Sequence, residues 1–321
     1  MGDRRSVDGI LLLNKALNIS SNMALQQVKR IYNAKKAGHT GSLDPLATGV
    51  LPICLGEATK FSGYLLDADK AYTAWGRLGF TSPTGDAEGE LTPVPNAPII
   101  SLSEFETALK TFIGTIKQIP PIYSALKKDG VPLYKLARKG QVLESEEMEK
   151  KARFITIESI QLDDYHYPDF QIKVRCSKGT YIRTLVEDIG KSLNSGAYLL
   201  NLRRDEAGPY ALEKSYTIEE LTAISSQSDD LKTLDALLLP MDTAVKNYPL
   251  LTLDDAQTKA LQQGKIINIS IARYCEERSL VEIQSETLIR LYNSDNLFLG
   301  LGILSSQGQL RVQRLVAVQF L

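Results

Sequence analysis

The sequence contains few of the residues that form disulfides or bind metals. Three cysteines and two histidines occur among its 321 residues. Cys54, Cys176 and Cys275 are widely separated and form no Cys-x-x-Cys pair, so we expect reduced thiols that pack as small apolar side chains. His39 and His166 add too few ligands for a zinc centre. We therefore predict neither a disulfide nor a bound metal.

Long apolar runs are also missing. No stretch approaches the roughly 20 apolar residues that a membrane-spanning helix needs, and the apolar run at residues 10–13 is too short for the core of a secretory signal. The hydrophobic fraction of 43% is typical of a globular protein, and the length predicts about two domains. We predict a cytoplasmic protein that binds no membrane.

The chain has no net positive charge overall, but one part of it does. The net charge at pH 7 is −1. Residues 205–259 carry eleven acids against four bases, a net of −7, and residues 260–321 have a net of +1, which leaves +5 on residues 1–204. Such segregation is typical of a protein that binds phosphates, although scattered solvated lysines give the same totals.

The densest cluster of glycine and proline lies at residues 38–52, GHTGSLDPLATGVLP. This loop contains His39 and a single carboxylate, Asp44, which Pro45 follows directly. Glycine allows the backbone to approach a ligand closely and proline fixes the chain, so the loop can present one carboxylate rigidly. An aspartate that only accepts backbone N–H groups in a turn explains the same residues. The loop alone leaves both interpretations open.

The remaining patterns predict an α+β chain with a small β domain at its end. Strands are expected at residues 9–13, 52–55, 70–80, 171–177, 199–204, 288–292, 297–304 and 310–318. Helices are expected at 21–32, 57–66, 103–112, about 180–190, 219–223 and 231–239. Ser103 and Glu106 have the spacing of a capping box, and Gly190 marks a helix end. Residues 81–98 predict a long surface connection.

Two features of this layout bear on binding. Arg183 falls in the first turn of its predicted helix, where the macrodipole is positive, so it needs a nearby anion from the protein or from a ligand. Residues 127–153 hold eight bases, five acids and Tyr134. A basic arm with an aromatic side chain can grip a phosphate backbone and stack a base, although a solvated helix face has the same composition.

A lone carboxylate limits the chemistry that the loop can perform. A P-loop is excluded because Gly-Lys-[Ser/Thr] does not follow the glycines, and an aspartyl-phosphate site lacks a second acid near Asp44 to hold its metal. Glycosidases pair two carboxylates, and nothing marks Glu57 as the partner. A nucleoside substrate fits better, because its base can leave without protonation by a second acid and a basic surface can hold phosphates.

Six short segments, distributed in order over residues 9–204, carry a more specific signal. They are GILLLNK at 9–15, GHTGSLDPLATGVLPICLGEATK at 38–60, KAY at 70–72, PIYSALK at 121–127, CSKGTYIRT at 176–184 and LRR at 202–204. Together they resemble the signature of the bacterial tRNA pseudouridine-55 synthases, the TruB-type family. Asn18 stands where the family usually has glycine, and asparagine tolerates the left-handed backbone that this turn needs.

The resemblance implies an enzyme that isomerises uridine 55 in the T loop of tRNA without cofactor or metal. Uracil is detached from N1, swung out of the loop and rejoined through C5. By the match, Asp44 is the essential carboxylate, as nucleophile or as base. Tyr72 stacks on the flipped uracil, and Arg183 pairs with Asp44.

The same resemblance implies further substrate contacts and a domain division. Tyr181 and Leu202 match residues that line the uracil pocket, His39 matches a residue that fills the space left by the base, and Lys15 is expected to contact substrate. We expect a pseudouridine synthase fold, a mixed and largely antiparallel sheet flanked by helices, over residues 1–247, with an RNA-gripping insertion at about 120–153. A PUA-like β-barrel domain is expected at 248–321, in a monomer that binds the T arm of tRNA. A synthase for another RNA uridine and a non-catalytic tRNA-binding module are the alternatives.

Overall fold

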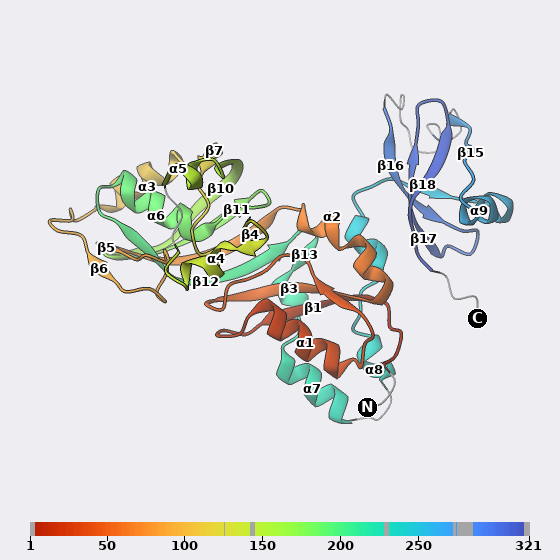
Figure 1. The fold of residues 1–321 in the computed structure, drawn as a ribbon, viewed down its shortest axis with the longest axis horizontal. Coiled ribbons are helices and arrows are strands. Elements are labelled where there is room, and N and C mark those ends of the chain that lie inside the picture. The colour runs from red at the N-terminus through yellow and green to blue at the C-terminus, as the bar shows by residue number, and fades with distance from the viewer. Residues whose placement is uncertain are drawn as a thin grey trace.

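The computed structural model describes residues 4–124, 126–141, 145–227, 231–271, 274 and 285–317. Within these residues the chain forms a large α+β body followed by a smaller β body (Figure 1). Cys54 and Cys176 are free and buried, as predicted, whereas Cys275 and the end of the strand predicted at 310–318 lie outside the described residues. No helix within the described ranges is long and apolar enough to cross a membrane.

A nine-stranded sheet forms the large body. Its main path runs β1 (Gly9–Lys15), β3 (Ala47–Leu55), β12 (Ala197–Ala207), β4 (Lys70–Leu78), β11 (Asp169–Cys176), β10 (Arg153–His166) and β7 (Gly114–Gln118), while β2 (Ala37–His39) pairs with β3 and β13 (Tyr210–Ala211) with β12. All of these pairings are antiparallel except that of β12 with β3. The predicted mixed, largely antiparallel sheet is confirmed.

Strand β1 shows why its sequence is apolar without alternation. Successive side chains of a strand point to opposite faces. Leu11 and Leu13 belong to the main core, whereas Ile10 and Leu12 belong to a second cluster on the other face. Both faces of the sheet are therefore buried at the edge that β1 forms, each in its own apolar cluster.

The main core lies under four helices. It takes residues from α1 (Ser21–Ile31), α3 (Leu102–Lys110), α6 (Ile182–Ser192) and α7 (Ile218–Gln227), and α1 packs beside α7 in Figure 1. The second cluster is covered by η1 (Gly56–Phe61), α2 (Ser62–Leu66) and η3 (Met241–Val245). Shorter elements are β5 (Phe80–Thr81), β6 (Thr92–Pro93), η2 (Leu212–Lys214) and α8 (Lys232–Asp235).

Several helix boundaries differ from the sequence predictions. The capping box before α3 is formed by Ser101 and Glu104, two residues before the predicted pair, because Ser101 is the residue with extended backbone that faces the free N–H groups. The helix predicted at 57–66 is split into η1 and α2, and the one at 231–239 is shortened to α8. Gly190 does not end α6 but lies inside it. Its missing side chain lets the helix approach β12, since a Cβ there would lie 2.3 Å from the backbone nitrogen of Ala197.

The insertion between β7 and β10 is not a single basic helix. It contains β8 (Lys127–Lys128), β9 (Val131–Pro132), α4 (Leu133–Ala137) and α5 (Ser145–Glu149). Leu133 and Met148 form a small core of their own, and Lys128 bonds to Glu147 at 2.7 Å. The insertion is therefore a compact unit that carries its bases outside.

The smaller body is a curled sheet of five strands in the order β14 (Leu250–Thr252), β16 (Thr287–Tyr292), β17 (Phe298–Leu304), β18 (Gln309–Leu315) and β15 (Ile267–Asn268). Helix α9 (Asp255–Gln262) packs against it, and its apolar residues form a separate cluster. Phe298 and Leu301 join the second cluster of the large body, with the rings of Phe61 and Phe298 centred 5.3 Å apart. A separate β domain was predicted and is confirmed.

We predict that Gly49→Ala destabilises the protein. Gly49 has φ +103 and pairs with Arg204 across the parallel strands, where an added Cβ would lie 2.2 Å from the Arg204 carbonyl oxygen. We expect a loss of about 2 kcal/mol or more in the free energy of unfolding, measured by urea denaturation. Gly63→Ala is the matched control, because nothing lies within 4 Å of its Cβ position. Equal midpoints for the two variants would contradict the prediction.

Candidate active site

Asp44 lies at the tip of the loop between β2 and β3. The strand β3 begins at Ala47, so the loop is shorter than the glycine pattern indicates. Its backbone is fixed on both sides of Asp44. The buried hydroxyl of Ser21 accepts from the Leu43 N–H and donates to the Leu43 carbonyl, and the Asn18 N–H donates to the Pro45 carbonyl at 2.8 Å. Asn18 has φ +64, the left-handed backbone expected there. The loop thus holds a carboxylate that is 49% exposed.

Arg183 is the partner of that carboxylate. Its side chain is 6% exposed, and one of its terminal nitrogens lies 2.9 Å from Asp44 Oδ2. Its Nε lies 3.6 Å from Asp86 Oδ2, and its two terminal nitrogens donate to the carbonyls of Thr84 and Tyr123 at 2.8 Å each. A guanidinium keeps its charge at any ordinary pH and must be paired when buried. Two carboxylates, those of Asp44 and Asp86, therefore supply the negative charge that we expected near Arg183.

Asp86 is the site residue that sequence reasoning missed. It is buried, accepts from Thr84 Oγ1 at 2.6 Å and from the Glu88 N–H at 3.1 Å, and faces Arg183. Residues 81–98 were predicted to be a surface connection, but Ala87 and Gly85 bond to the backbone of Leu199 at the start of β12. Asp86 is one of three acids in a segment rich in Gly, Pro and Thr, and nothing local marked it as the buried one.

A pocket of about 460 Å³ opens beside Asp44, within the size range of ligand sites. Besides Asp44, Asp86 and Arg183, its walls include His39, Glu88 and, from the insertion, Tyr123, Tyr134 and Arg138. Burial, and then the charge of Arg204, lowers the pKa of His39, so its ring is neutral at pH 7. Burial, followed by Asp86 and Asp44, raises the pKa of Glu88. Because residues of the Asp44 loop and of the insertion both line the pocket, it lies between these two parts of the chain.

Tyr72 and Leu202 lie on neighbouring strands of the sheet next to this loop. Tyr72 pairs with Arg204 across β4 and β12, and Leu202 pairs with Ala47 at the start of β3. Arg204 is 1% exposed and donates to the carbonyls of Val50 and Gly41, so it fixes the loop from the sheet. Burial raises the pKa of Tyr72, and the charge of Asp44 adds to the increase. Neither Tyr72 nor Leu202 is among the residues that line the pocket beside Asp44.

Lys15 and Tyr181 also lie outside the lining of that pocket. The Lys15 ammonium is buried and donates to the carbonyls of Ala16 and Ile19 at 2.8 Å each, and burial lowers its pKa to about 8. Lys15 therefore closes the turn that contacts Pro45 and does not offer its charge to a ligand in this conformation. Tyr181 directly precedes α6, with the Arg153 guanidinium 4.7 Å from its ring centre.

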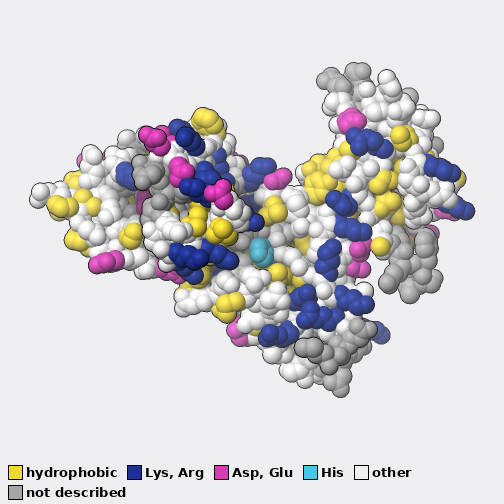
Figure 2. Space-filling model, viewed as in Figure 1, with side chains coloured by type: hydrophobic (Ala, Val, Ile, Leu, Met, Phe, Trp, Pro, Cys, Tyr) yellow, Lys and Arg dark blue, Asp and Glu magenta, His cyan; other side chains and the backbone are white. Residues whose placement is uncertain are grey.

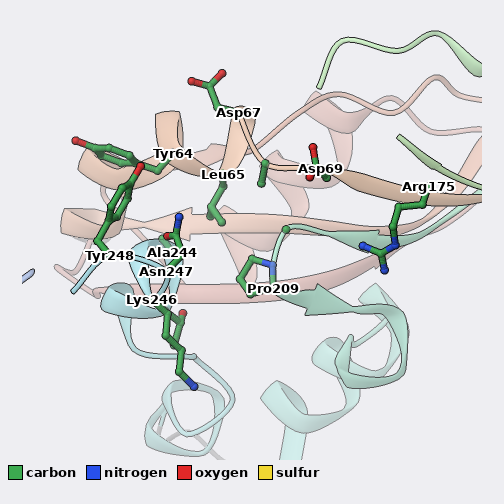
Figure 3. Close-up of a pocket in the computed structure, with 13 residues that line it drawn as sticks. Tyr64, Leu65, Asp67, Asp69, Arg175, Pro209, Ala244, Lys246, Asn247 and Tyr248 are labelled. Atoms are coloured by element: carbon green, nitrogen blue, oxygen red, sulfur yellow. The ribbon is translucent and has the colours of Figure 1, made fainter. Parts of the chain in front are cut away.

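A second pocket of about 400 Å³ lies on the large body, between α2 and the segment that follows η3. Figure 3 shows Tyr64 and Tyr248 together at one end and Arg175 at the other. Two of its charged side chains are already paired, Asp67 with Lys178 and Arg175 with Glu206. Within the described part of the chain, no group of three or more His, Cys, Asp or Glu side chains is arranged to hold a metal. The pocket beside Asp44 remains the better candidate for chemistry.

Lysine and arginine side chains gather in two places on the face drawn in Figure 2, over α1 with the segment that follows it and over the insertion near α4. Exposed members of these two patches are Arg30, Lys35, Lys36, Lys135, Arg138 and Lys139. Both patches belong to residues 1–204, the part of the chain with net positive charge. Such a surface suits a phosphate backbone.

The comparisons with known proteins agree with this arrangement. A model of the TruB family pseudouridylate synthase N-terminal domain matches residues 29–182, and a model of the tRNA pseudouridylate synthase B C-terminal domain matches residues 183–246. A model of the pseudouridine synthase II TruB C-terminal region matches residues 249–316. The chain is 46% identical over 314 residues to the tRNA pseudouridine synthase B of Ectopseudomonas mendocina (strain ymp), across 98% of this chain and 96% of that protein.

The chain belongs to the TruB family of pseudouridine synthases. A second relative of this TruB-family chain is the tRNA pseudouridine synthase B of Neisseria meningitidis serogroup B (strain ATCC BAA-335 / MC58). It is 47% identical over 298 residues, which are 93% of this chain and 90% of that protein.

Two solved structures share the fold. One is an H/ACA RNP bound to a substrate RNA containing 2′-deoxyuridine, with a TM-score of 0.71 at 21% identity over 96% of this chain and 84% of that chain. The other is a Cbf5-Nop10-Gar1 complex, with a TM-score of 0.70 at 23% identity over 96% of this chain and 84% of that chain.

We predict that the two buried charges of the TruB-family chain, Arg183 and Asp86, are coupled in stability. Arg183→Met leaves Asp86 buried without its cation and should cost about 3–5 kcal/mol of unfolding free energy. Asp86→Asn should be milder, and the double variant should lose clearly less than the sum of the two single losses. Urea denaturation measures all three. Strictly additive losses would show that the two side chains do not interact.

Proposed function

We propose that this protein converts uridine 55 in the T loop of tRNA to pseudouridine, with Asp44 as the catalytic carboxylate. The observation that carries the proposal is the half-exposed Asp44 carboxylate, paired at 2.9 Å with the buried Arg183 at the edge of a pocket of about 460 Å³. Relatives named tRNA pseudouridine synthase B, 46% and 47% identical, support tRNA as the substrate.

The reaction moves one glycosidic bond within a single nucleotide. The bond between ribose C1′ and uracil N1 breaks, and a bond between C1′ and C5 forms. C5 loses a proton and N1 gains one, so substrate and product contain the same atoms. Asp44 acts on the ribose as nucleophile or as base, both of which suit a single oriented carboxylate. Arg183 keeps that carboxylate in place.

The uracil must leave the RNA stack before its glycosidic bond can be reached. Extrusion costs about a few kcal/mol, and stacking on an aromatic side chain returns about 1–3 kcal/mol. We assign this stacking to Tyr72 and further contacts to Tyr181, Leu202 and His39. Basic side chains over α1 and the insertion supply the phosphate contacts.

The domain roles follow from the same proposal. We assign residues 1–247 to catalysis, with the insertion at about 120–153 closing on the T arm, and residues 248–321 to RNA binding as a PUA-like domain. Because the proposed substrate is tRNA, we propose that the protein works in the cytoplasm. We also propose that it works as a monomer.

We predict that Asp44→Asn abolishes pseudouridine formation and leaves the Kd for tRNA within about twofold, because the amide keeps the shape of the side chain but is neither nucleophile nor base. Pseudouridine is mapped along tRNA transcripts for the wild type and the variant. Asp164→Asn, a change of an exposed acid on β10, is the matched control and should stay active. If the wild type modifies a different uridine, that uridine is the target instead of uridine 55. If the wild type binds tRNA but modifies no uridine, the protein is a non-catalytic RNA-binding protein.

We also predict that Tyr72→Phe separates binding from catalysis. Because burial raises the pKa of Tyr72, the neutral phenol is its resting form near pH 7. The Phe ring keeps the stacking surface, so the Kd for tRNA should hardly change, whereas the rate should fall about 10²-fold or more if the hydroxyl handles the C5 proton. Single-turnover rates at saturating enzyme measure this. A wild-type rate would limit Tyr72 to stacking.

A further inference from the structure

The two ends of the insertion meet at one point of the sheet. Strand β7 ends at Gln118, β10 begins at Arg153, and these two residues are paired in the sheet register. The insertion therefore leaves and returns through adjacent residues. Both of them contact Tyr181, which lies between β11 and α6. The base of the insertion is thus in contact with a segment that leads directly into the site.

Gln118 clamps the backbone of Tyr181. Its side chain is buried, with 1% of the residue exposed. Its Oε1 accepts from the Tyr181 N–H at 2.8 Å, and its Nε2 donates to the Tyr181 carbonyl at 3.1 Å. Tyr181 is the N-cap of α6 and has no side-chain capping bond of its own. A primary amide supplies this donor and acceptor together at every ordinary pH, so Gln118 matches both peptide groups of Tyr181.

Arg153 holds the ring of the same residue. Its guanidinium carbon lies 4.7 Å from the ring centre of Tyr181, a distance at which cation–π attraction is effective. Its Nε is buried and has no hydrogen-bond partner, so that side of the guanidinium is placed by packing. Gly179 provides the space, since a Cβ at this position would lie 3.0 Å from an Arg153 terminal nitrogen.

A third contact joins the insertion to Arg183, two residues along the chain. The Tyr123 carbonyl, within the insertion, accepts from the same Arg183 nitrogen that lies 2.9 Å from Asp44. Moving the base of the insertion would therefore displace Tyr181 and the guanidinium that orients Asp44 together. Misplacing a catalytic group by about 1 Å can cost about 10²-fold in rate.

We propose that Gln118 and Arg153 are positioning residues, which fix Tyr181 and the Arg183–Asp44 pair and so make the rate of the chemical step depend on the placement of the insertion. This inference rests on the proposed function. It predicts that changes at the base of the insertion alter the rate on bound RNA and leave RNA affinity unchanged. A phosphate-binding role for Arg153 would alter affinity instead.

The test measures single-turnover pseudouridine formation at saturating enzyme together with the Kd for tRNA. Gln118→Met and Arg153→Lys should each slow the reaction by about 10-fold to 10²-fold, with the Kd within about twofold of the wild type. Gln161→Met, a change of an exposed glutamine on β10, is the matched control and should be fully active. A rate within threefold of the wild type for Gln118→Met would overturn the proposal. So would an Arg153→Lys variant whose Kd for tRNA rises while its rate at saturating enzyme equals that of the wild type.

Gln118→Glu separates positioning from a loss of stability. As a carboxylic acid the new side chain can donate to the Tyr181 carbonyl and accept from its N–H, whereas as a carboxylate it can only accept. Its rate relative to the wild type should therefore be highest at low pH and fall as the pH rises between 5.5 and 8.5, while the ratio for Gln118→Met stays flat. Loss of stability alone would lower the thermal unfolding midpoint without this trend, and a Gln118→Glu rate equal to the wild type at pH 8.5 would overturn the proposal.

These outcomes are distinct from failure of the proposed function. If the wild type modifies uridine 55, Asp44→Asn does not, and Gln118→Met is as fast as the wild type, the proposed function stands and the positioning role is wrong. If the wild type forms no pseudouridine in tRNA, the proposed function itself is wrong.

Discussion

The site depends on burying one guanidinium. Arg183 cannot lose its charge and has almost no access to water, so its environment must supply anions and carbonyl groups. The two anions come from the β2–β3 loop and from the segment before β6, and the two carbonyls come from Thr84 and from Tyr123 in the insertion. Three parts of the chain that are distant in sequence, around Asp44, Thr84–Asp86 and Tyr123, thus converge on one side chain. The position of Asp44 is therefore a property of the whole large body and not of its own loop.

The sheet makes this convergence possible through its one parallel pairing. Strand β12 runs beside β3 and carries Arg204, whose buried guanidinium donates to the carbonyls of Val50 and Gly41, on either side of Asp44. Gly49 accepts the close approach of the Arg204 backbone. Two buried arginines therefore act on the loop from different directions, Arg204 on its backbone and Arg183 on the carboxylate. This arrangement presents Asp44 to a pocket while its main chain is fixed.

The sequence predicts those features that have local causes. Alternating or continuous apolar runs located eight of the eighteen strands in the described residues, but not β7 or the long β10. The position of Arg183 in the first turn of a helix correctly demanded an anion. The partner Asp86 could not be found in the same way, because its burial comes from pairing of the 85–87 segment with Leu199, far along the chain. The glycine at position 190 predicts a helix end, although the reason for its presence is the close approach of β12. Long-range packing decides such positions, and one sequence gives no local sign of it.

The charges around Asp44 also constrain how RNA can approach. Asp44, Asp86 and Glu88 share a pocket with Arg183 and Arg138, and the raised pKa of Glu88 reflects burial and then the two neighbouring carboxylates. A phosphate brought into this acidic pocket would be repelled, since like charges interact strongly where water is partly excluded. Apart from Arg138, which lines the pocket, the exposed bases of the two patches lie outside it, over α1 and the insertion. For the proposed tRNA substrate, an uncharged base can therefore enter the pocket while its backbone stays on the basic rim, a geometry that a flipped nucleotide provides.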